Sequence, residues 1–535
     1  MKQIFMFFAM LCFGAAFGQV QKLGELSAGK FLDSAVIMED DESDVFGYCL
    51  LYELDRKSKE IFELEYVILD KNLNKLTSVS LTQAVFKTWM ARTRTELTFV
   101  KKIGSQLTIG VNDRLVNFGE FDLIRFFNHR FIDLNLDNFT FSKEYKYENF
   151  TKKELEYKAG DKMEFNDFWD LQKLIKTKSS YMLAFAAPEY NPKVTAVTGS
   201  MMKFYFKRYK SVKRFALLDK DMNIVWSKDI NSDKKTACHY DYLDSDGEVL
   251  LLKKEELINK EVLEAKSIEV YNIKTGQFLG EMMIESKDNN IDLNSVIISS
   301  DKIHLFATTY SKKGKNLGYT HIEFDKQSVK ETNRNAFLWK DFTSVIPGIT
   351  EFGETGKGVW HTVQDFVITP KRNVLVVIEA LETKAPWQLG TDPKMQVLLK
   401  DMYLLEINSD KNIVFSKKIE KKNSVEVPAG LNWEEMRRYG VFDYIFCQNI
   451  NKAGDFVLFY RLNDRIGSNK KIAKKPLWTL GIVSCVAGEY GFETLPLYGD
   501  NIKIYPGLAK NGYIRLLEVN EKTKQGEMRL EKINY

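Results

Sequence analysis

A recurrent hairpin decides the fold, and one copy reads Phe215-Ala-Leu-Leu-Asp219-Lys-Asp221-Met-Asn223-Ile-Val-Trp226-Ser-Lys228. An apolar strand runs into a polar turn, and a second strand follows with an apolar residue three positions after the turn. The turn contains Asn, which tolerates a positive φ better than most residues. Two such strands joined by such a turn indicate a β-hairpin.

Other segments repeat this plan along the whole chain. Three clear copies cover residues 66–78, 268–281 and 402–417, and weaker ones begin near Phe131, His321, Trp478 and Tyr513. Between the hairpins lie short apolar runs, which are typical of strands buried on both faces. These runs are Phe46–Leu54, Tyr181–Ala186, Val249–Leu252, Ile303–Ala307, Val374–Ala380 and Phe456–Leu462.

The spacing of the hairpins predicts an all-β fold, a β-propeller. Copies recur about every 50–85 residues, enough for roughly four strands per unit. A four-stranded blade cannot cover both of its own faces, but blades stacked around an axis cover each other. We predict about seven blades, with six to eight possible, and expect Ala35–Met38 to complete the last one. The alternative is a pair of β-sandwiches with similar hairpins.

Two of the turns resemble the Asp-box of sialidase-like propellers, Ser/Thr-x-Asp-x-Gly-x-x-Trp/Phe. The similar residues are the central Asp and the aromatic in Asp221…Trp226 and Asp410…Phe415, whereas Asn replaces the Gly in both. In that family the box is a structural turn away from the active site. The resemblance therefore implies fold and says little about function.

The first 18 residues are predicted to be a cleavable signal peptide. Lys2 precedes an uncharged apolar run from Ile4 to Phe17, and Ala16-Phe17-Gly18 has small residues where a signal peptidase needs them. Cleavage before Gln19 would release a protein to the periplasm or the exterior, with no transmembrane segment expected. The Phe-rich leader and Lys/Asn/Phe/Tyr-rich body resemble uncharacterised exported proteins of the Bacteroidota.

Composition limits the partners and cofactors. The formal net charge of +4 is small for 535 residues, so nucleic acid is not expected as a partner. We expect no cofactor, no metal and a monomer. The cysteines form no Cys-x-x-Cys pair, so buried free thiols are the main interpretation, with a Cys447–Cys485 disulfide as the alternative that export permits.

Residues 19–535 are predicted to form one domain with insertions near 143–178 and 383–440. A helical spacing of apolar residues spans 165–175, residues 383–400 and 422–440 are loop-like, and a short helix is expected from Asn432.

Few residues in the sequence suggest a catalytic or metal-binding role. The run His239, Asp241, Asp244, Asp246 and Glu248 contains a fragment of a calcium loop, although a plain hairpin turn is the preferred interpretation.

Two aromatic segments also stand out. Trp360-His361 could face a glycan at the mouth of the ring, against a core Trp beside a surface His. Residues 203–214 interleave basic and aromatic side chains, which suits either polyanion binding or a half-exposed strand.

The function predicted from these features is ligand or protein binding at one face by a secreted, non-catalytic propeller. A glycan or protein ligand is possible. The alternative is a glycan-active hydrolase or lyase using carboxylates at the central channel, but no pair can be chosen from the 73 acidic residues without spatial information. Catalytic and ligand-binding residues therefore stay unknown at this point.

Overall fold

The six apolar runs predicted as buried strands are all interior strands of antiparallel sheets in the computed structural model. Five of them are the second strand of a four-stranded sheet, and the strand at 374–384 lies inside a six-stranded sheet. They are β3 (Val45–Arg56), β11 (Met182–Ala186), β15 (Val249–Ile258), β19 (Lys302–Tyr310), β24 (Val374–Lys384) and β29 (Phe456–Leu462). In β19, seven consecutive residues are buried, because neighbouring sheets cover both faces of the strand.

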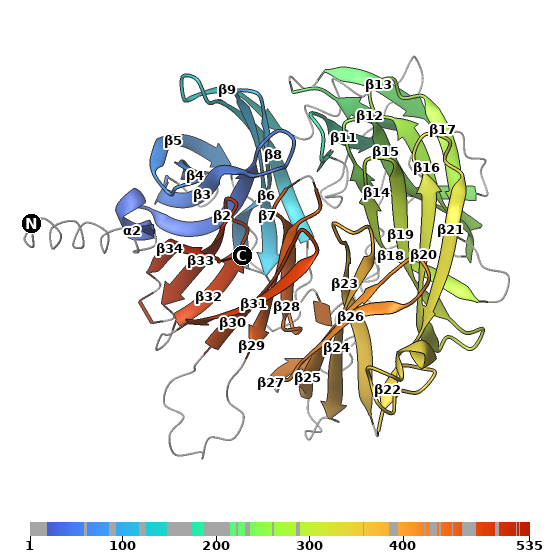
Figure 1. Cartoon of the computed structure of the whole chain (residues 1–535). Coiled ribbons are helices and arrows are strands. Elements are labelled where there is room, and N and C mark those ends of the chain that lie inside the picture. Colours follow the sequence, from blue (N-terminus) through green and yellow to red (C-terminus); the bar gives the residue numbers. More distant parts are fainter. Residues whose placement is uncertain are drawn as a thin grey trace, which may run out of the picture.

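The chain forms eight antiparallel sheets that follow one another along the sequence, which makes an eight-bladed β-propeller (Figure 1). The number lies within the predicted range of six to eight. Blade 1 contains β2 (Lys30–Met38), β3, β4 (Ile61–Asp70) and β5 (Lys75–Ala84). Blade 2 contains β6 (Arg92–Ile103), β7 (Gln106–Val116), β8 (Arg125–Asn135) and β9 (Thr140–Lys146). Blade 3 contains β10 (Leu174–Lys176), β11, β12 (Arg214–Leu218) and β13 (Ile224–Asp229).

The next blades follow the same order from inner to outer strand. Blade 4 contains β14 (Thr236–Ser245), β15, β16 (Val262–Asn272) and β17 (Phe278–Met283). Blade 5 contains β18 (Asn290–Ile298), β19, β20 (Asn316–Asp325) and β21 (Glu331–Leu338). Blade 6 contains β22 (Glu354–Thr355), β23 (Val359–Ile368), β24, β25 (Lys394–Ile407), β26 (Ile413–Ile419) and β27 (Asn423–Pro428), and the short helix η2 (Trp339–Phe342) precedes it.

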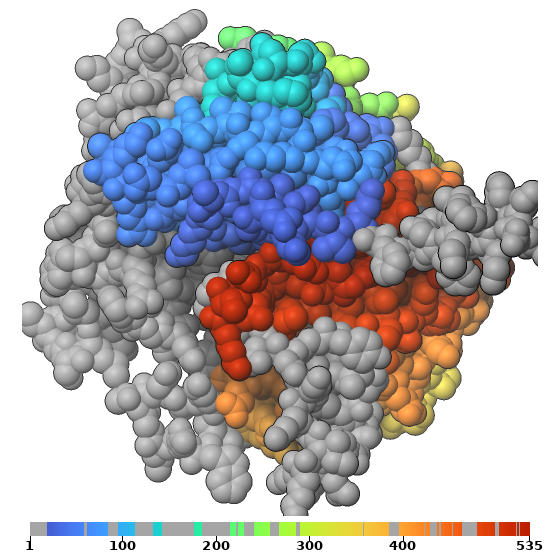
Figure 2. Space-filling view, turned by 90° about the vertical axis from the view of Figure 1, so that its left-hand side faces the viewer, coloured from blue at the N-terminus to red at the C-terminus, as the bar shows by residue number. Residues whose placement is uncertain are grey.

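The ring is closed by the two ends of the chain. Blade 7 contains β28 (Tyr444–Asn449), β29, β30 (Trp478–Val486) and β31 (Glu489–Leu497). Blade 8 contains β32 (Ile502–Gly507), β33 (Tyr513–Asn520), β34 (Gly526–Lys532) and β1 (Val20–Lys22), after which α2 (Leu23–Leu26) follows. Figure 2 shows the N-terminal residues in blue lying against the C-terminal strands in red.

The prediction for the closing strand was wrong. Residues 35–38 lie in β2, which pairs with β3 as the innermost strand of blade 1. The last blade is instead completed by β1, in which Val20 pairs with Arg529 and Lys22 with Glu527. Three residues carry too weak a pattern for a strand to be recognised.

The structure describes residues 19–535 with gaps, so the predicted signal peptide lies outside the described residues. The gaps are 58–60, 85–91, 117–124, 147–173, 187–213, 221–222, 231–235, 259–261, 285–288, 357, 385–393, 422, 429–435, 438–439, 452, 463–477, 498–501, 521, 524 and 535. Within the described ranges, no helix has the length and apolar character needed to cross a membrane.

Apolar clusters fill the spaces between neighbouring blades. One cluster joins blades 8 and 1 through Leu23, Tyr48 and Leu530. Similar clusters lie between blades 1 and 2, and between each successive pair from blade 3 to blade 8. The hydrophobic core is therefore distributed around the ring, as the propeller argument requires.

The four clear hairpins are confirmed, and each joins the third and fourth strand of a blade. In the first, Asp70 Oδ1 accepts hydrogen bonds of 2.8 Å from the backbone N–H groups of Asn72 and Asn74. The positive φ falls on Leu73 (65°) and on Lys411 in the corresponding turn, rather than on Asn. The Asp or Asn that begins these turns supports the backbone, whereas Gly276 has the expected positive φ of 69°.

Replacing Gly276 by Ala is expected to lower the free energy of unfolding by about 2 kcal/mol. A Cβ at this left-handed position would lie 2.6 Å from the ring of Trp226, which belongs to the preceding blade, blade 3. Urea unfolding followed by circular dichroism measures the effect. Gly247→Ala is the matched control, because nothing lies within 4 Å of its Cβ position, and equal stability of the two variants would contradict the prediction.

The predicted insertions are partly strand. Residues 143–146 belong to β9 and residues 174–176 to β10, while 147–173, with most of the predicted helix, lies outside the described residues. The expected loop at 383–400 is largely β25, and β27 pairs with it where another loop was expected. This extra hairpin extends blade 6. Met436 and Arg437 are helical, in agreement with the short helix expected there.

The two faces of the ring differ in the length of their connections. The turns between first and second strands, and between third and fourth strands, have two to six residues each, and we call their side the short-turn face. The sequence distances to the next strand are longer after β9, β11, β21 and β27, and these strands end on the opposite, long-connection face.

Polar contacts on the short-turn face link every pair of neighbouring blades. They are Asp44–Asn511 N, Asp40–Lys102, Lys220 O–Gln106, Asp244–Lys178, Asp246–Lys326, Asp301–Arg372, Gly488 O–Lys371 and Ala509 O–Gln448. This face is therefore a continuous polar ring around the axis.

Candidate functional site

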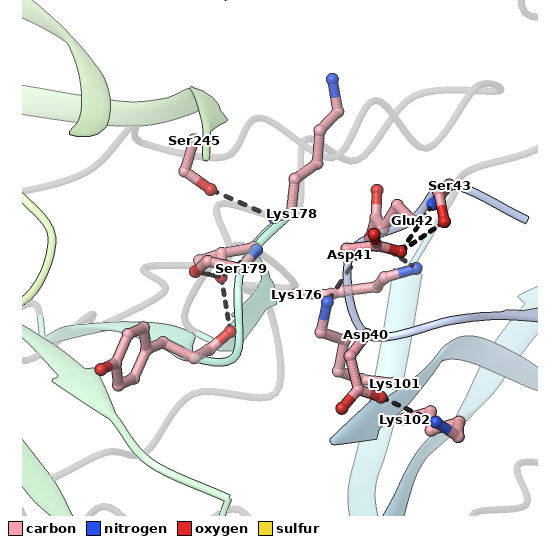
Figure 3. A network of polar contacts seen from close by, with 12 residues as sticks. Asp40, Asp41, Glu42, Ser43, Lys101, Lys102, Lys176, Lys178, Ser179 and Ser245 are labelled. Atoms are coloured by element: carbon pink, nitrogen blue, oxygen red, sulfur yellow. Dashed lines mark hydrogen bonds and ion pairs between the residues drawn. The ribbon is translucent and has the colours of Figure 1, made fainter. Parts of the chain in front are cut away.

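The most concentrated charged group of this ring lies where the inner strands of blades 1 to 4 end (Figure 3). Its centre is the acidic β2–β3 turn, Glu39-Asp40-Asp41-Glu42-Ser43-Asp44. Glu42 adopts a positive φ of 54°, which is uncommon for a residue with a side chain. Ser43 supports the turn by donating from its backbone N–H to Asp41 Oδ1, at 3.1 Å.

Two lysines from different blades share the carboxylate of Glu42. Its Oε1 lies 3.5 Å from Lys101 Nζ of blade 2 and 3.4 Å from Lys176 Nζ of blade 3. Blades 1 and 3 are not neighbours, so the turn must extend over the inner edge of blade 2. We call Glu42, Lys101 and Lys176 the rim cluster.

Lys101 is the most buried member of the rim cluster. Its side chain is only 2% exposed, and its Nζ has no hydrogen-bond acceptor among the described residues. Burial lowers its pKa, an effect that the nearby Glu42 opposes. Glu42 Oε1, at 3.5 Å, is its ion-pair partner rather than a close hydrogen-bond acceptor, so the ammonium retains capacity to bind a further anionic group.

Lys102, the next residue, is fully paired by contrast. Its Nζ lies 3.0 Å from Glu39 Oε2 and 2.9 Å from Asp40 Oδ1. Burial alone would raise the pKa of Asp40, but hydrogen bonds from Lys102 and from the Gly104 backbone outweigh burial and lower it. This pair fixes the acidic turn to blade 2.

Blade 4 borders the rim cluster on its other side. Lys178 Nζ lies 2.9 Å from Asp244 Oδ1, and the backbone N–H of Lys178 donates to Ser245 Oγ at 3.1 Å. Burial raises the pKa of Asp244, although Lys178 acts in the opposite direction. The Lys178 side chain is 58% exposed, so this edge of the site meets solvent.

The calcium-loop fragment is a hairpin turn, in agreement with the preferred interpretation. It joins β14 to β15, and Asp246 accepts backbone hydrogen bonds from Glu248 and Val249. Lys178 and Lys326 neutralise its two central carboxylates, Asp244 and Asp246. A cation would therefore have to displace two ammonium groups.

The structure reverses the preferred interpretation of Trp360 and His361, in which the Trp was buried and the His exposed. Trp360 is 38% exposed at the start of β23, on the long-connection face, and His361 is buried. His361 Nδ1 lies 3.0 Å from the carbonyl oxygen of Gly353. The preferred interpretation, a core Trp beside a surface His, was therefore wrong.

Among the described residues, one His/Glu group has metal-ligand spacing: His304, His321 and Glu323 in blade 5. His304 Nδ1 and His321 Nε2 lie 3.1 Å apart and form a hydrogen bond. The Lys302 ammonium donates to Glu323 Oε2, while Glu323 Oε1 lies 4.0 Å from His321 Nε2. The two histidines therefore contact each other, and Glu323 is ion-paired to Lys302.

Several other candidates can be placed only in part. The basic-aromatic residues 203–213 lie outside the described residues. Cys447 and Cys485 are free thiols that pack in the same cluster between blades 6 and 7, so the disulfide alternative is not formed. Burial raises the pKa of Cys485 to about 11, which makes this thiol unreactive.

The aromatics of the two Asp-box-like turns have the structural role that the resemblance implied. Trp226 Nε1 donates to the carbonyl oxygen of Ile273 in blade 4, at 2.8 Å. Phe415 stacks on Tyr490 of blade 7, with ring centroids 4.0 Å apart. Each aromatic side chain therefore connects its hairpin to the following blade through a direct contact.

No protein-family model and no curated protein matches the sequence. Solved structures that align with it include the Dos1 propeller, at 8% identity and a TM-score of 0.41, over 97% of this chain and 96% of that one. Two prolyl endopeptidase structures align as well. One has 8% identity and a TM-score of 0.35 over 90% of this chain and 53% of that one.

The other endopeptidase structure is prolyl oligopeptidase B from Galerina marginata, at 9% identity and a TM-score of 0.36, over 95% of this chain and 56% of that one. The chain spans about half the length of both peptidases. Its own sheet topology defines the class: the chain is an eight-bladed β-propeller closed by its N-terminal strand.

Proposed function

We propose that this chain is an exported, non-catalytic β-propeller that binds an acidic group of a glycan or protein ligand at the rim cluster. The observation that carries the proposal is the sharing of one carboxylate, Glu42, by two ammonium groups at 3.4 and 3.5 Å, one of them buried. A ligand carboxylate or sulfate next to Lys101 and Lys176 would complete this arrangement.

The surroundings support an acidic rather than a neutral ligand. Lys178, which is ion-paired to Asp244 but 58% exposed, adds a third ammonium at the solvent edge, and the hydroxyls of Ser179 and Ser245 lie close by (Figure 3). Hydrogen bonds between charged partners are about twice as strong as neutral ones. The strained backbone of Glu42 fits a turn held in place for function.

A binding role is favoured over the glycan-active alternative. Among the residues that the structure describes, the buried carboxylates with raised pKa values are Asp244, Asp365 and Glu379, and burial is the main cause in each. Each is already engaged, by Lys178, Tyr444 and Lys421 respectively. A glycosidase needs two carboxyl groups facing one bond, and these three are committed to internal partners in blades 4 and 6.

The test is calorimetric titration with an oligogalacturonate and with a neutral oligogalactose of the same length. We expect the acidic glycan alone to bind, with affinity lowered roughly tenfold in Lys176→Gln. Lys312→Gln is the matched control, because it removes the same charge from an exposed turn on the long-connection face.

A glutamate-rich peptide and its glutamine counterpart form the second arm of the titration, for a protein ligand. Equal behaviour of acidic and neutral probes in both arms would refute the proposal. Shortening of the oligogalacturonate during incubation would favour the enzymatic alternative.

A further inference from the structure

A lysine and two carboxylates lie together, fully enclosed, where blade 6 meets blade 7. Lys421 Nζ is 2.5 Å from Glu379 Oε1 and 2.8 Å from Asp443 Oδ2, and the charged side chains have no exposed area. Glu379 belongs to β24, Lys421 lies between β26 and β27, and Asp443 immediately precedes β28.

A cluster of buried apolar residues includes sequence neighbours of these charged groups. Leu381 lies two residues after Glu379, and Val441 and Phe442 directly precede Asp443. Asn423 Nδ2 donates to Asp443 Oδ1 at 3.0 Å, and the backbone N–H of Asp443 donates to Glu379 Oε1 at 3.0 Å. These contacts hold the Asp443 carboxyl group in one orientation against the lysine.

Two carboxylates beside one ammonium leave an excess negative charge in a site with no solvent-exposed side-chain area. Such a charge is costly, so one carboxyl group should be protonated. Burial raises the pKa of Glu379, which makes Glu379 the acid of the group. A neutral acid that touches an amine and adjoins a second carboxyl group can carry protons between them.

We propose that Lys421 and Asp443 become joined by an isopeptide bond, with Glu379 as the catalytic proton carrier. Lys421 Nζ, once deprotonated through Glu379, attacks Asp443 Cγ and forms the C–N bond. One Asp443 oxygen accepts two protons that were on the ammonium, and the C–O bond breaks to release water. An ammonium and a carboxylate give an amide and one water, so the step balances without a co-reactant.

The geometry favours this reaction for two reasons. The reacting groups are held in contact, and this orientation replaces the entropy loss of a bimolecular encounter. The product is a neutral amide, so the desolvation cost of a buried ion pair disappears. Asn423 is placed to stabilise the oxygen on which negative charge develops during attack.

The bond would join Lys421 to Asp443, the two ends of the segment that contains β27 and connects blade 6 to blade 7. This connection leaves the long-connection face, and β27 extends blade 6 through its pairing with β25. A covalent closure would restrict the unfolded chain as a disulfide does, but it would withstand reducing agents.

The test is the intact mass of the purified, denatured protein. We expect the mass of the mature sequence less one water, and a digest in which the peptides that contain Lys421 and Asp443 remain joined. A mass with no water lost would overturn the proposal. The digest also separates this bond from an imide at Asp246-Gly247, which loses water as well but leaves Lys421 free.

Two variants identify the roles of the residues. Glu379→Gln keeps a hydrogen-bonding side chain without the acid, and Lys421→Arg keeps the cation without an amine able to form this amide. Both are expected to show the full mass, after circular dichroism has verified folding. A Lys421–Asp443 linkage that persists in Glu379→Gln would overturn the role of Glu379, and the wild-type mass decides the bond itself even if neither variant folds.

Discussion

Replacing both Leu23 and Leu26 by alanine is expected to lower the free energy of unfolding by about 5 kcal/mol. The two side chains are 1% and 5% exposed, and they pack in the cluster that joins blade 8 to blade 1. They lie in α2, directly after the strand β1 that completes blade 8. Their truncation leaves cavities at the junction between blades 8 and 1, where the two ends of the chain meet.

Val20→Ala is the matched control for this prediction. Val20 lies in β1 itself, but its side chain is 53% exposed, so its truncation should change the free energy of unfolding by less than about 0.5 kcal/mol. Urea unfolding followed by circular dichroism compares the variants. If the double variant were as stable as Val20→Ala, ring closure would not depend on the packing of α2.

Lowering the pH from 7 to 4 is expected to cost the wild-type protein about 3 kcal/mol more stability than the His321→Gln variant. His321 is buried in a stack with Phe306 and His304, and burial lowers its pKa to about 4, from 6.5 when exposed. The unfolded chain therefore binds a proton that the folded protein resists, so stability is complete above pH 6.5 and falls as the pH approaches 4.

His304, Glu323 and Lys302 are the charged groups that act on His321. His304 has a lowered pKa for the same reason, and Glu323 and Lys302 face the two rings with opposite charges. Glutamine cannot titrate, and carboxylates elsewhere titrate in both proteins and cancel in the difference. Parallel pH dependences of the two unfolding free energies would contradict the assignment to His321.

The sequence by itself determined the repeated hairpins and the all-β class, because both depend on local chemistry. Asp70 and Asn408 shape their turns through contacts within five residues, and the apolar run of β24 requires cover on both faces wherever it lies. The propeller follows from these two facts, since stacked blades supply that cover.

Tertiary structure alone decided the number of blades, the closing strand and the sites. The number of blades depends on the angles between sheets, which no single segment encodes. β1 becomes a strand only because β34 offers it an edge. The acidic turn at 39–44 was visible in the sequence, but Lys101 and Lys176 reach Glu42 from two other blades.

The same holds for Lys421, whose carboxylates come from β24 and from the start of blade 7. Ring closure brings together residues that lie far apart in the chain. The chemistry of this propeller therefore arises between blades, where a pattern within one segment carries no information.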